Sequence, residues 1–263
     1  NASIVTLIPI TILMYRSELG SSNPAAVFLP ILLATSTSTL VGVFSVAWVQ
    51  KLNIFNRTVL AYLGGFALFI LLVSLYFSRL PENERLAVSS ACGNFIFCAV
   101  IAVFIIAGLY KKVNVYDTFI QGAKEGFDIA VRIIPYLVAM LVAIGVLRAS
   151  GVLDFIVWGF GRGFELLGLN TDFVAALPTA IMKPLSGSGA RAMMIETLSN
   201  YGADSFQGFV ASIVQGSTET TFYVLAVYFG AVKITKVKEA LPCALLADFA
   251  GITAAILLAY YFY

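Results

Sequence analysis

Four stretches of the chain are long enough to cross a lipid bilayer and carry no charge apart from one aspartate. They are residues 25–50, 58–78, 86–110 and 240–263. A transmembrane helix needs roughly 20 apolar residues, and in lipid only helices and closed barrels satisfy every backbone polar group. The chain is 60% hydrophobic and 11% charged, whereas soluble domains are about a quarter charged. The sequence therefore predicts an all-α integral membrane protein.

The residue types that the chain lacks argue against several classes of function. It contains no histidine, and its three cysteines all lie in apolar stretches. Histidine is the commonest general base and the commonest metal ligand among side chains, so we expect neither an enzyme nor a resident cofactor or metal. The net charge of +2 gives no electrostatic reason to expect a nucleic-acid partner. The expected surroundings are a lipid bilayer and a small solute.

The region after the third apolar stretch changes character. Residues 116–130 mix charged and apolar residues at helical spacing, which predicts an amphipathic helix lying at the membrane interface. Residues 133–147 are apolar but short, and we expect them to span separately with an arginine at each end. Residues 152–167 carry three charges and predict a second interfacial helix.

Two later segments are interrupted within the hydrophobic region. Residues 173–182 and 190–198 are each too short to cross, and the sequence KPLSGSG at 183–189 joins them. This arrangement predicts a re-entrant hairpin of two half-helices. The segment 205–232 is long enough to span, but we expect its helix to break at residues 215–218, which read QGST.

The two ends of the chain resemble each other. NASIVTLIPI at the start matches QGSTETTFYV, and LPILLATSTSTLVG matches LPCALLADFAGITA, through shared small, threonine and LP residues. The turns that follow differ in lysine and arginine content, as opposite membrane faces require. We therefore expect inverted repeats, a frequent architecture of secondary transporters. The expected organisation is a first repeat at 1–52, connecting helices at 53–114 and a second repeat at 115–263.

Long motifs in the second repeat point to a known family. The runs KPLSGSGARAMMIETLSNYGADSF, QGSTETTFYVLAVYFGAV and LLADFAG resemble the bacterial spore maturation protein B family, which belongs to the nucleoside-recognition or gate-domain group. Residues 1–39 resemble the C-terminal half of its partner, spore maturation protein A. The resemblance indicates a fusion of the two, with the first part of the A-like half missing upstream or supplied by a partner chain.

The resemblance implies a multi-pass protein of the bacterial cytoplasmic (inner) membrane, related to the gate domains of nucleoside carriers. It does not give a substrate. The sequence lacks a P-loop, so we expect ion-coupled secondary transport rather than coupling to a nucleotide. A symmetric homo-oligomer is compatible with this class, but the sequence does not decide the oligomeric state.

A broken helix in lipid frees backbone groups that need polar partners. We therefore expect a solute to bind between the hairpin, the broken helix and the first residues of the chain. The candidate binding residues are Lys183, Ser186, Gly187, Ser188, Gln215, Gly216, Ser217, Thr218, Glu219, Asn1 and Ser3.

The two acids within the apolar segments, Glu219 and Asp248, are candidates for ion coupling, because charges at membrane depth usually face the protein interior and serve function. Their alternative role is a structural pairing with Lys183 or Arg191. Lys183 and Arg191 could in turn hold an anionic substrate or only neutralise nearby carboxylates.

Two other functions are compatible with these residues. In a membrane scaffold that transports nothing, the polar breaks would only hold the two halves together or join a spore-maturation type of complex. In a divalent metal-ion gate, Met182, Met193, Met194 and Cys243 would serve as soft ligands. The absence of histidine makes the metal gate the weakest of the three hypotheses.

Overall fold

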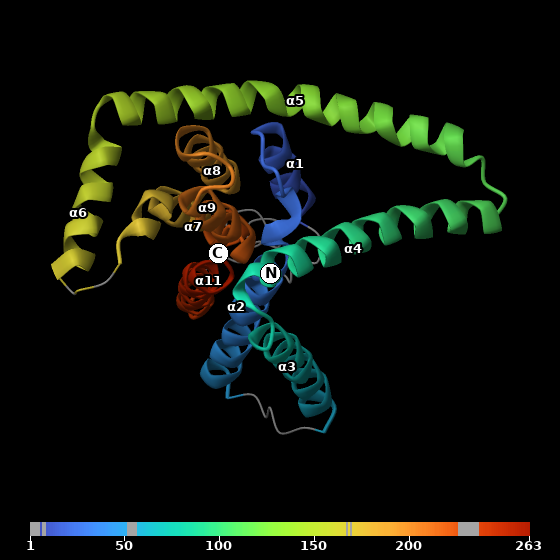
Figure 1. Ribbon diagram of the computed structural model, residues 1–263, viewed down its shortest axis with the longest axis horizontal. Coiled ribbons are helices and arrows are strands. Elements are labelled where there is room, and N and C mark those ends of the chain that lie inside the picture. Colours follow the sequence, from blue (N-terminus) through green and yellow to red (C-terminus); the bar gives the residue numbers. More distant parts are fainter. Residues whose placement is uncertain (1–5, 7–8, 52–56, 167, 169, 226–236) are drawn as a thin grey trace.

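The computed structural model describes residues 6, 9–51, 57–166, 168, 170–225 and 237–263 (Figure 1). All regular elements in these ranges are helical. In chain order they are α1 (Ile10–Glu18), the 3-10 helix η1 (Pro24–Val27), α2 (Phe28–Val49), α3 (Arg57–Ser78), α4 (Glu82–Tyr110), α5 (Val115–Ala149), α6 (Val152–Leu166), the 3-10 helix η2 (Asp172–Ala176), α7 (Leu177–Leu185), α8 (Gly187–Tyr201), α9 (Phe206–Ser217), α10 (Thr221–Val224) and α11 (Ala240–Phe262).

Three of the described helical segments are long and apolar enough to cross a membrane: Pro24–Val49, Glu84–Tyr110 and Ala240–Phe262. They match three of the four predicted spans. The fourth predicted span is α3, whose apolar part is Ala61–Phe77. The prediction of an all-α membrane protein is therefore confirmed at the level of helix content and apolar length.

The centre of the protein is α9. Every residue of this helix from Gly208 to Ser217 is buried, and α9 contacts α2, α7, α8, α11 and η2. Its neighbours surround it in Figure 1. An apolar helix that is enclosed on all sides is the ordinary centre of a helical protein. A change in α9 therefore affects the packing of all the helices that contact it.

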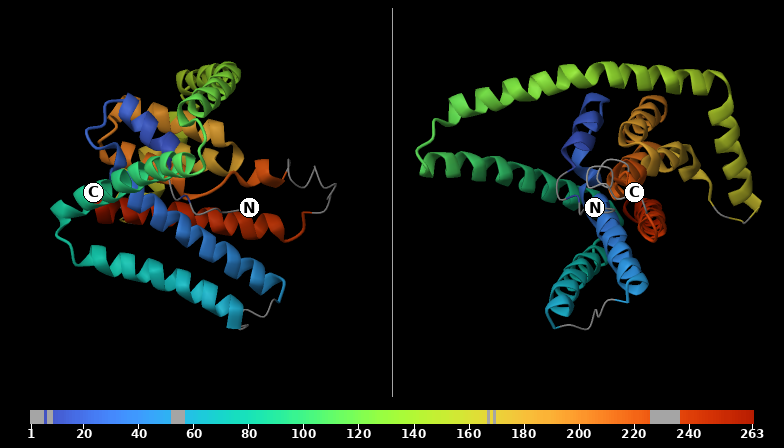
Figure 2. Two further views of the ribbon diagram at one scale, coloured as in Figure 1. Left: turned by 90° about the vertical axis from the view of Figure 1, so that its right-hand side faces the viewer. Right: turned by 180° about the vertical axis from the view of Figure 1, so that it is seen from behind.

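Helices α2 and α11 pack along each other in opposite directions (Figure 2). Gly42 lies against Ala247, while the earlier residue Ser38 lies against the later residue Gly251. The Ser38 hydroxyl donates a 2.9 Å hydrogen bond to the Ala247 carbonyl. Small residues let helix backbones approach closely in membranes, where apolar contacts with lipid offer no advantage. This pair joins the beginning of the described chain to its end.

The expectation of two separate segments at 116–130 and 133–147 is wrong. Both belong to α5, one continuous helix of 35 residues, which passes over α1 and α8 in Figure 1. The sequence between them changes from polar to apolar, but a change in composition does not end a helix. The helix also continues through Pro135, although proline removes one backbone hydrogen bond.

Helices α3, α4 and α5 lie at the periphery (Figures 1 and 2). Large apolar side chains of α4, including Phe95 and Phe104, are about three-quarters exposed. Exposed apolar rows of this kind suit contact with lipid chains. The polar groups discussed below are instead enclosed near α9.

Candidate functional site

Helix α9 ends at Ser217, and the backbone is unwound for a few residues before α10 begins. Thr218 has an extended backbone with φ −141° and ψ 176°, and helix resumes at Thr221. The Ser217 hydroxyl donates to the carbonyl of Val214 in the last turn. Serine and threonine hydroxyls compete with the backbone for helical partners, and β-branched residues favour extended conformations. The three threonines within residues 218–221, which read TETT, therefore account for the break.

The predicted position of the break was about three residues too early. Gln215 and Gly216 are still helical, and the interruption covers residues 218–220. Gly216 has a different purpose: a Cβ there would lie 2.7 Å from Ile31 and 3.0 Å from Ile12. The residue is glycine because α9 packs tightly against α1 and α2, and not because the backbone unwinds there.

A sharp turn between α7 and α8 lies next to the break. Only Ser186 separates these helices, and its hydroxyl accepts a hydrogen bond from the Gly189 amide as the N-cap of α8. The predicted seven-residue loop at 183–189 is therefore wrong, because Lys183 and Pro184 complete α7 and the glycines begin α8. A Cβ on Gly187 would lie 2.8 Å from the Thr220 hydroxyl, which shows how closely the turn approaches the break.

A cavity of about 310 Å³ opens beside the break and the turn. It is lined by residues of α1, α7, α8 and α9, by Thr6 and Pro9 before α1, and by Thr218 and Glu219 of the break. Its lining residues are Thr6, Pro9, Ile10, Thr11, Ile12, Tyr15, Lys183, Arg191, Met194, Gln215, Gly216, Thr218 and Glu219.

Several buried polar atoms of the cavity lining have no hydrogen-bond partner in the described structure. They are the Gln215 side-chain oxygen, the Thr218 hydroxyl and the Nε of Arg191. Gln215 does make one long contact, from its amide nitrogen to the Gly187 carbonyl at 3.4 Å. Buried polar atoms are nearly always paired with protein or water, so these atoms mark a place where a polar molecule is expected.

Asp248 of α11 lies behind the break. Its side chain is buried, and Oδ2 accepts a 2.6 Å hydrogen bond from the Thr221 hydroxyl while Oδ1 has no partner. The charges of Lys183 and Glu219 lie within electrostatic range of it. Among the described residues, no ion pair joins Asp248 or Glu219 to Lys183 or Arg191, so the considered pairing is not formed.

The structure therefore brings part of the predicted set together. Lys183, Gln215, Gly216, Thr218 and Glu219 line one cavity. Ser186, Gly187, Ser188 and Ser217 belong to the adjoining turn and helix end and do not line it. Asn1 and Ser3 lie outside the described residues.

The sequence interpretation missed the contribution of α1. Thr11 and Tyr15 line the cavity, and their spacing of four residues places them on one face of the helix. That spacing was a usable signal. Arg191 was noted as a flanking cation but was not placed among the binding residues.

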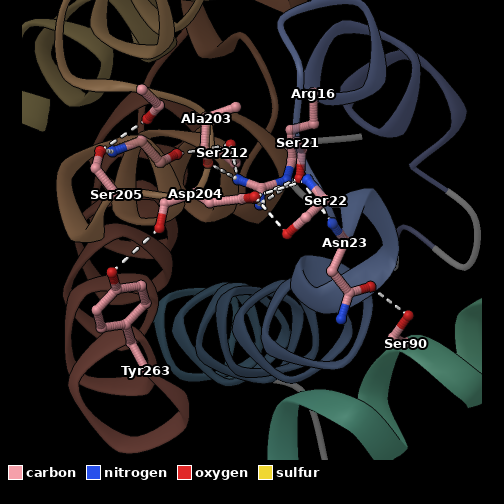
Figure 3. Close-up of polar contacts among 12 residues, drawn as sticks. Arg16, Ser21, Ser22, Asn23, Ser90, Ala203, Asp204, Ser205, Ser212 and Tyr263 are labelled. Carbon is pink, nitrogen blue, oxygen red and sulfur yellow. Dashed lines mark hydrogen bonds and ion pairs between the residues drawn. The ribbon is translucent and has the colours of Figure 1, made fainter.

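A buried arginine holds α1 in position (Figure 3). Arg16 at the end of α1 donates to the Ala203 carbonyl at 2.7 Å, to the Ser212 hydroxyl and to Asp204. Although partial burial alone would raise the pKa of the Asp204 carboxyl, hydrogen bonds from Ser21 and Ser22 and the charge of Arg16 lower it below its usual value. This cluster joins α1, whose residues Thr11 and Tyr15 line the cavity, to the α8–α9 loop.

The fold and the site define a membrane-embedded helical protein with a broken central helix beside a tight helical turn. Sequence comparison shows which family this protein belongs to. Residues 130–235 match the Gate family, described as nucleoside recognition. Over 159 residues, the chain is 48% identical to spore maturation protein B of Bacillus subtilis (strain 168). The aligned region covers 60% of this chain and 88% of that protein. The chain therefore belongs to the spore maturation protein B family, as the motifs between residues 183 and 251 indicated. No solved structure matches it significantly.

Proposed function

We propose that the protein is a carrier or gated pore for a small polar solute in the bacterial cytoplasmic membrane. The cavity beside the helix break is the proposed binding site, and Asn1 and Ser3 remain part of the proposal. The observation that carries it is the group of unpaired buried polar atoms on Gln215, Thr218 and Arg191 around a cavity of about 310 Å³. That volume lies at the lower end of the range of ligand pockets.

The proposal includes two gate-type repeats of opposite orientation, with the α7–α8 turn entering the membrane as a re-entrant hairpin. The antiparallel packing of α2 against α11 supports the inverted arrangement. So does the similar position of α1 before α2 and of α10 before α11. In carriers built this way, solute binds near the midplane where the discontinuous helices meet.

We further propose that transport is coupled to an ion through Glu219 and Asp248. Asp248 is buried in an apolar helix with one carboxylate oxygen unpaired. A carboxylate held in this way is costly in lipid and is usually kept for function. Glu219 is one of the break residues and lines the proposed cavity itself, whereas Asp248 is hydrogen-bonded to Thr221 at the end of the break.

A scaffold differs from a carrier in its response to solutes. The purified full-length protein in detergent is heated with nucleosides, amino acids or carboxylates, and a ligand of the native state raises the melting temperature. Solutes that raise it are then tested for uptake into proteoliposomes. A carrier takes up such a solute, and the exchange of Gln215→Leu weakens this uptake without changing the fold. If no solute changes the melting temperature and none is taken up, the protein is a scaffold.

A further inference from the structure

We propose that the cavity takes a small anionic solute, one that carries a carboxylate or phosphate group, held between Lys183 and Arg191. This inference rests on the proposed solute-binding role of the cavity and adds the charge of the solute to it. Lys183 comes from α7 and Arg191 from α8. The turn at Ser186 folds these two helices against each other, which brings both cations to one cavity.

Positive charge is in excess at this site. The charged side chains among the lining residues are Lys183, Arg191 and Glu219, two cations against one carboxylate. Neither cation forms an ion pair with another described residue. Lys183 is only 7% exposed, and a buried charge is strongly unfavourable unless it is paired or hydrogen-bonded. A bound anion would supply the missing partner.

The carboxylates near Lys183 do not remove this excess. Glu219 and Asp248 act on Lys183 through their charge, but both lie beyond ion-pair distance from it. Asp248 does not line the cavity and already accepts a hydrogen bond from Thr221. Asp248 therefore does not offset the charge of the cavity lining, which stays at two cations against the one carboxylate of Glu219.

The donors around the cavity suit a carboxylate or phosphate. The Nε of Arg191 is buried and has no acceptor, and a guanidinium group can only donate. Arginine recognises planar carboxylates and phosphates through paired hydrogen bonds, and lysine acts on them as a point charge. An uncharged solute would leave the excess positive charge of the cavity lining uncompensated.

The test compares pairs of solutes that differ in charge. Binding to the purified full-length protein is measured by thermal shift and by calorimetry for succinate against succinamide, for AMP against adenosine, and for inorganic phosphate alone. We expect the charged member of a pair to bind and the uncharged member to bind at least tenfold more weakly. The carboxylate and phosphate arms separate the two sources of the anionic group.

Three variants locate the binding. Lys183→Gln and Arg191→Gln each remove one charged contact, which is worth about 1.5–3 kcal/mol, so we expect the anion to bind about ten- to hundredfold more weakly. Lys183→Arg and Arg191→Lys keep the charge and should restore most of the affinity, which separates a charge effect from a folding defect. Arg162→Gln is the control, because Arg162 is exposed and lines a separate depression with Glu165.

Each outcome decides the matter. Anion binding that is weakened in the Lys183 and Arg191 variants and retained in Arg162→Gln supports the inference. Binding that is lost in Arg162→Gln overturns it, because the anion would then bind at the other depression. Equal or tighter binding of adenosine or succinamide overturns the anionic class but keeps the proposed solute site. If no solute of any charge binds, both this inference and the proposed function fail.

Discussion

The hydroxyl of Thr221, the first helical residue after the break, donates a 2.6 Å hydrogen bond to the buried carboxylate of Asp248. This bond joins α10 to α11 at the depth where the backbone unwinds. It leaves the other carboxylate oxygen unpaired. The two residues therefore form a link between the break and the transmembrane helix behind it.

Removal of the Thr221 hydroxyl should destabilise the protein. Thr221→Val has nearly the same shape but leaves a buried carboxylate without its donor, which is worth about 1–3 kcal/mol. The melting temperature in detergent measures the loss, and Thr221→Ser should remain close to the native protein. The control is Thr197→Val, because the buried Thr197 hydroxyl bonds only to Met193 within its own helix. Equal losses in the two valine variants would contradict the importance of the Asp248 link.

The Arg16–Asp204 cluster should make stability depend on acid pH. The pKa of Asp204 is lowered in the folded protein, so its carboxylate stabilises the fold above the unfolded pKa of about 3.9. This contribution is lost as the pH falls through the lower, folded pKa, because protonation then removes the negative charge of Asp204 that pairs with Arg16. Melting temperatures from pH 7 to pH 2.5 measure it.

Asp204→Asn is the comparison for this pH dependence. The variant should melt below the native protein at neutral pH, and the difference should disappear in acid. Glu165→Gln is a matched control, since the exposed Arg162–Glu165 pair contributes little to stability. A constant difference between the native protein and Asp204→Asn at all pH values would rule out this role for the Asp204 charge.

Gly251 should not accept a side chain. An added Cβ would lie 2.4 Å from the Thr218 methyl, 2.8 Å from Ser38 and 3.1 Å from the Ser217 carbonyl. Gly251→Ala therefore separates α11 from both α2 and the break, and overpacking of this kind destabilises by about 1–3 kcal/mol. Gly64→Ala in α3 is the control, because nothing lies within 4 Å of its added Cβ. The melting temperature of that variant should be unchanged or higher.

The cavity should be accessible to water-soluble reagents. Cys92, Cys98 and Cys243 are first replaced by serine or alanine, and Thr11→Cys is introduced on the α1 side of the cavity. A charged thiol reagent should modify this cysteine quickly, and a bound solute should protect it. Val214→Cys, at a fully buried position of α9, should not react. Equal reactivity at both positions would mean that no defined cavity exists.

Sequence alone was sufficient to predict the four long apolar helices α2, α3, α4 and α11. A charge-free apolar run of bilayer length has one stable backbone solution, since lipid offers no partner for unpaired amides. The predicted final span 240–263 and helix α11 (Ala240–Phe262) agree to within one residue. The polar interruption near Gln215 was also visible, because serine, threonine and glutamate contrast with the apolar residues around them.

Only the tertiary structure decided where each interruption lies and what surrounds it. Gly216 was taken for the break, but it is a packing site against Ile31, and that role depends on a residue far away in the chain. Thr11, Tyr15 and Arg191 reach the cavity only because Arg16 fixes α1 and Ser186 folds α8 back on α7. Local sequence sets helix length and polarity, whereas contacts between distant segments determine which polar groups remain unpaired and which residues line the same cavity.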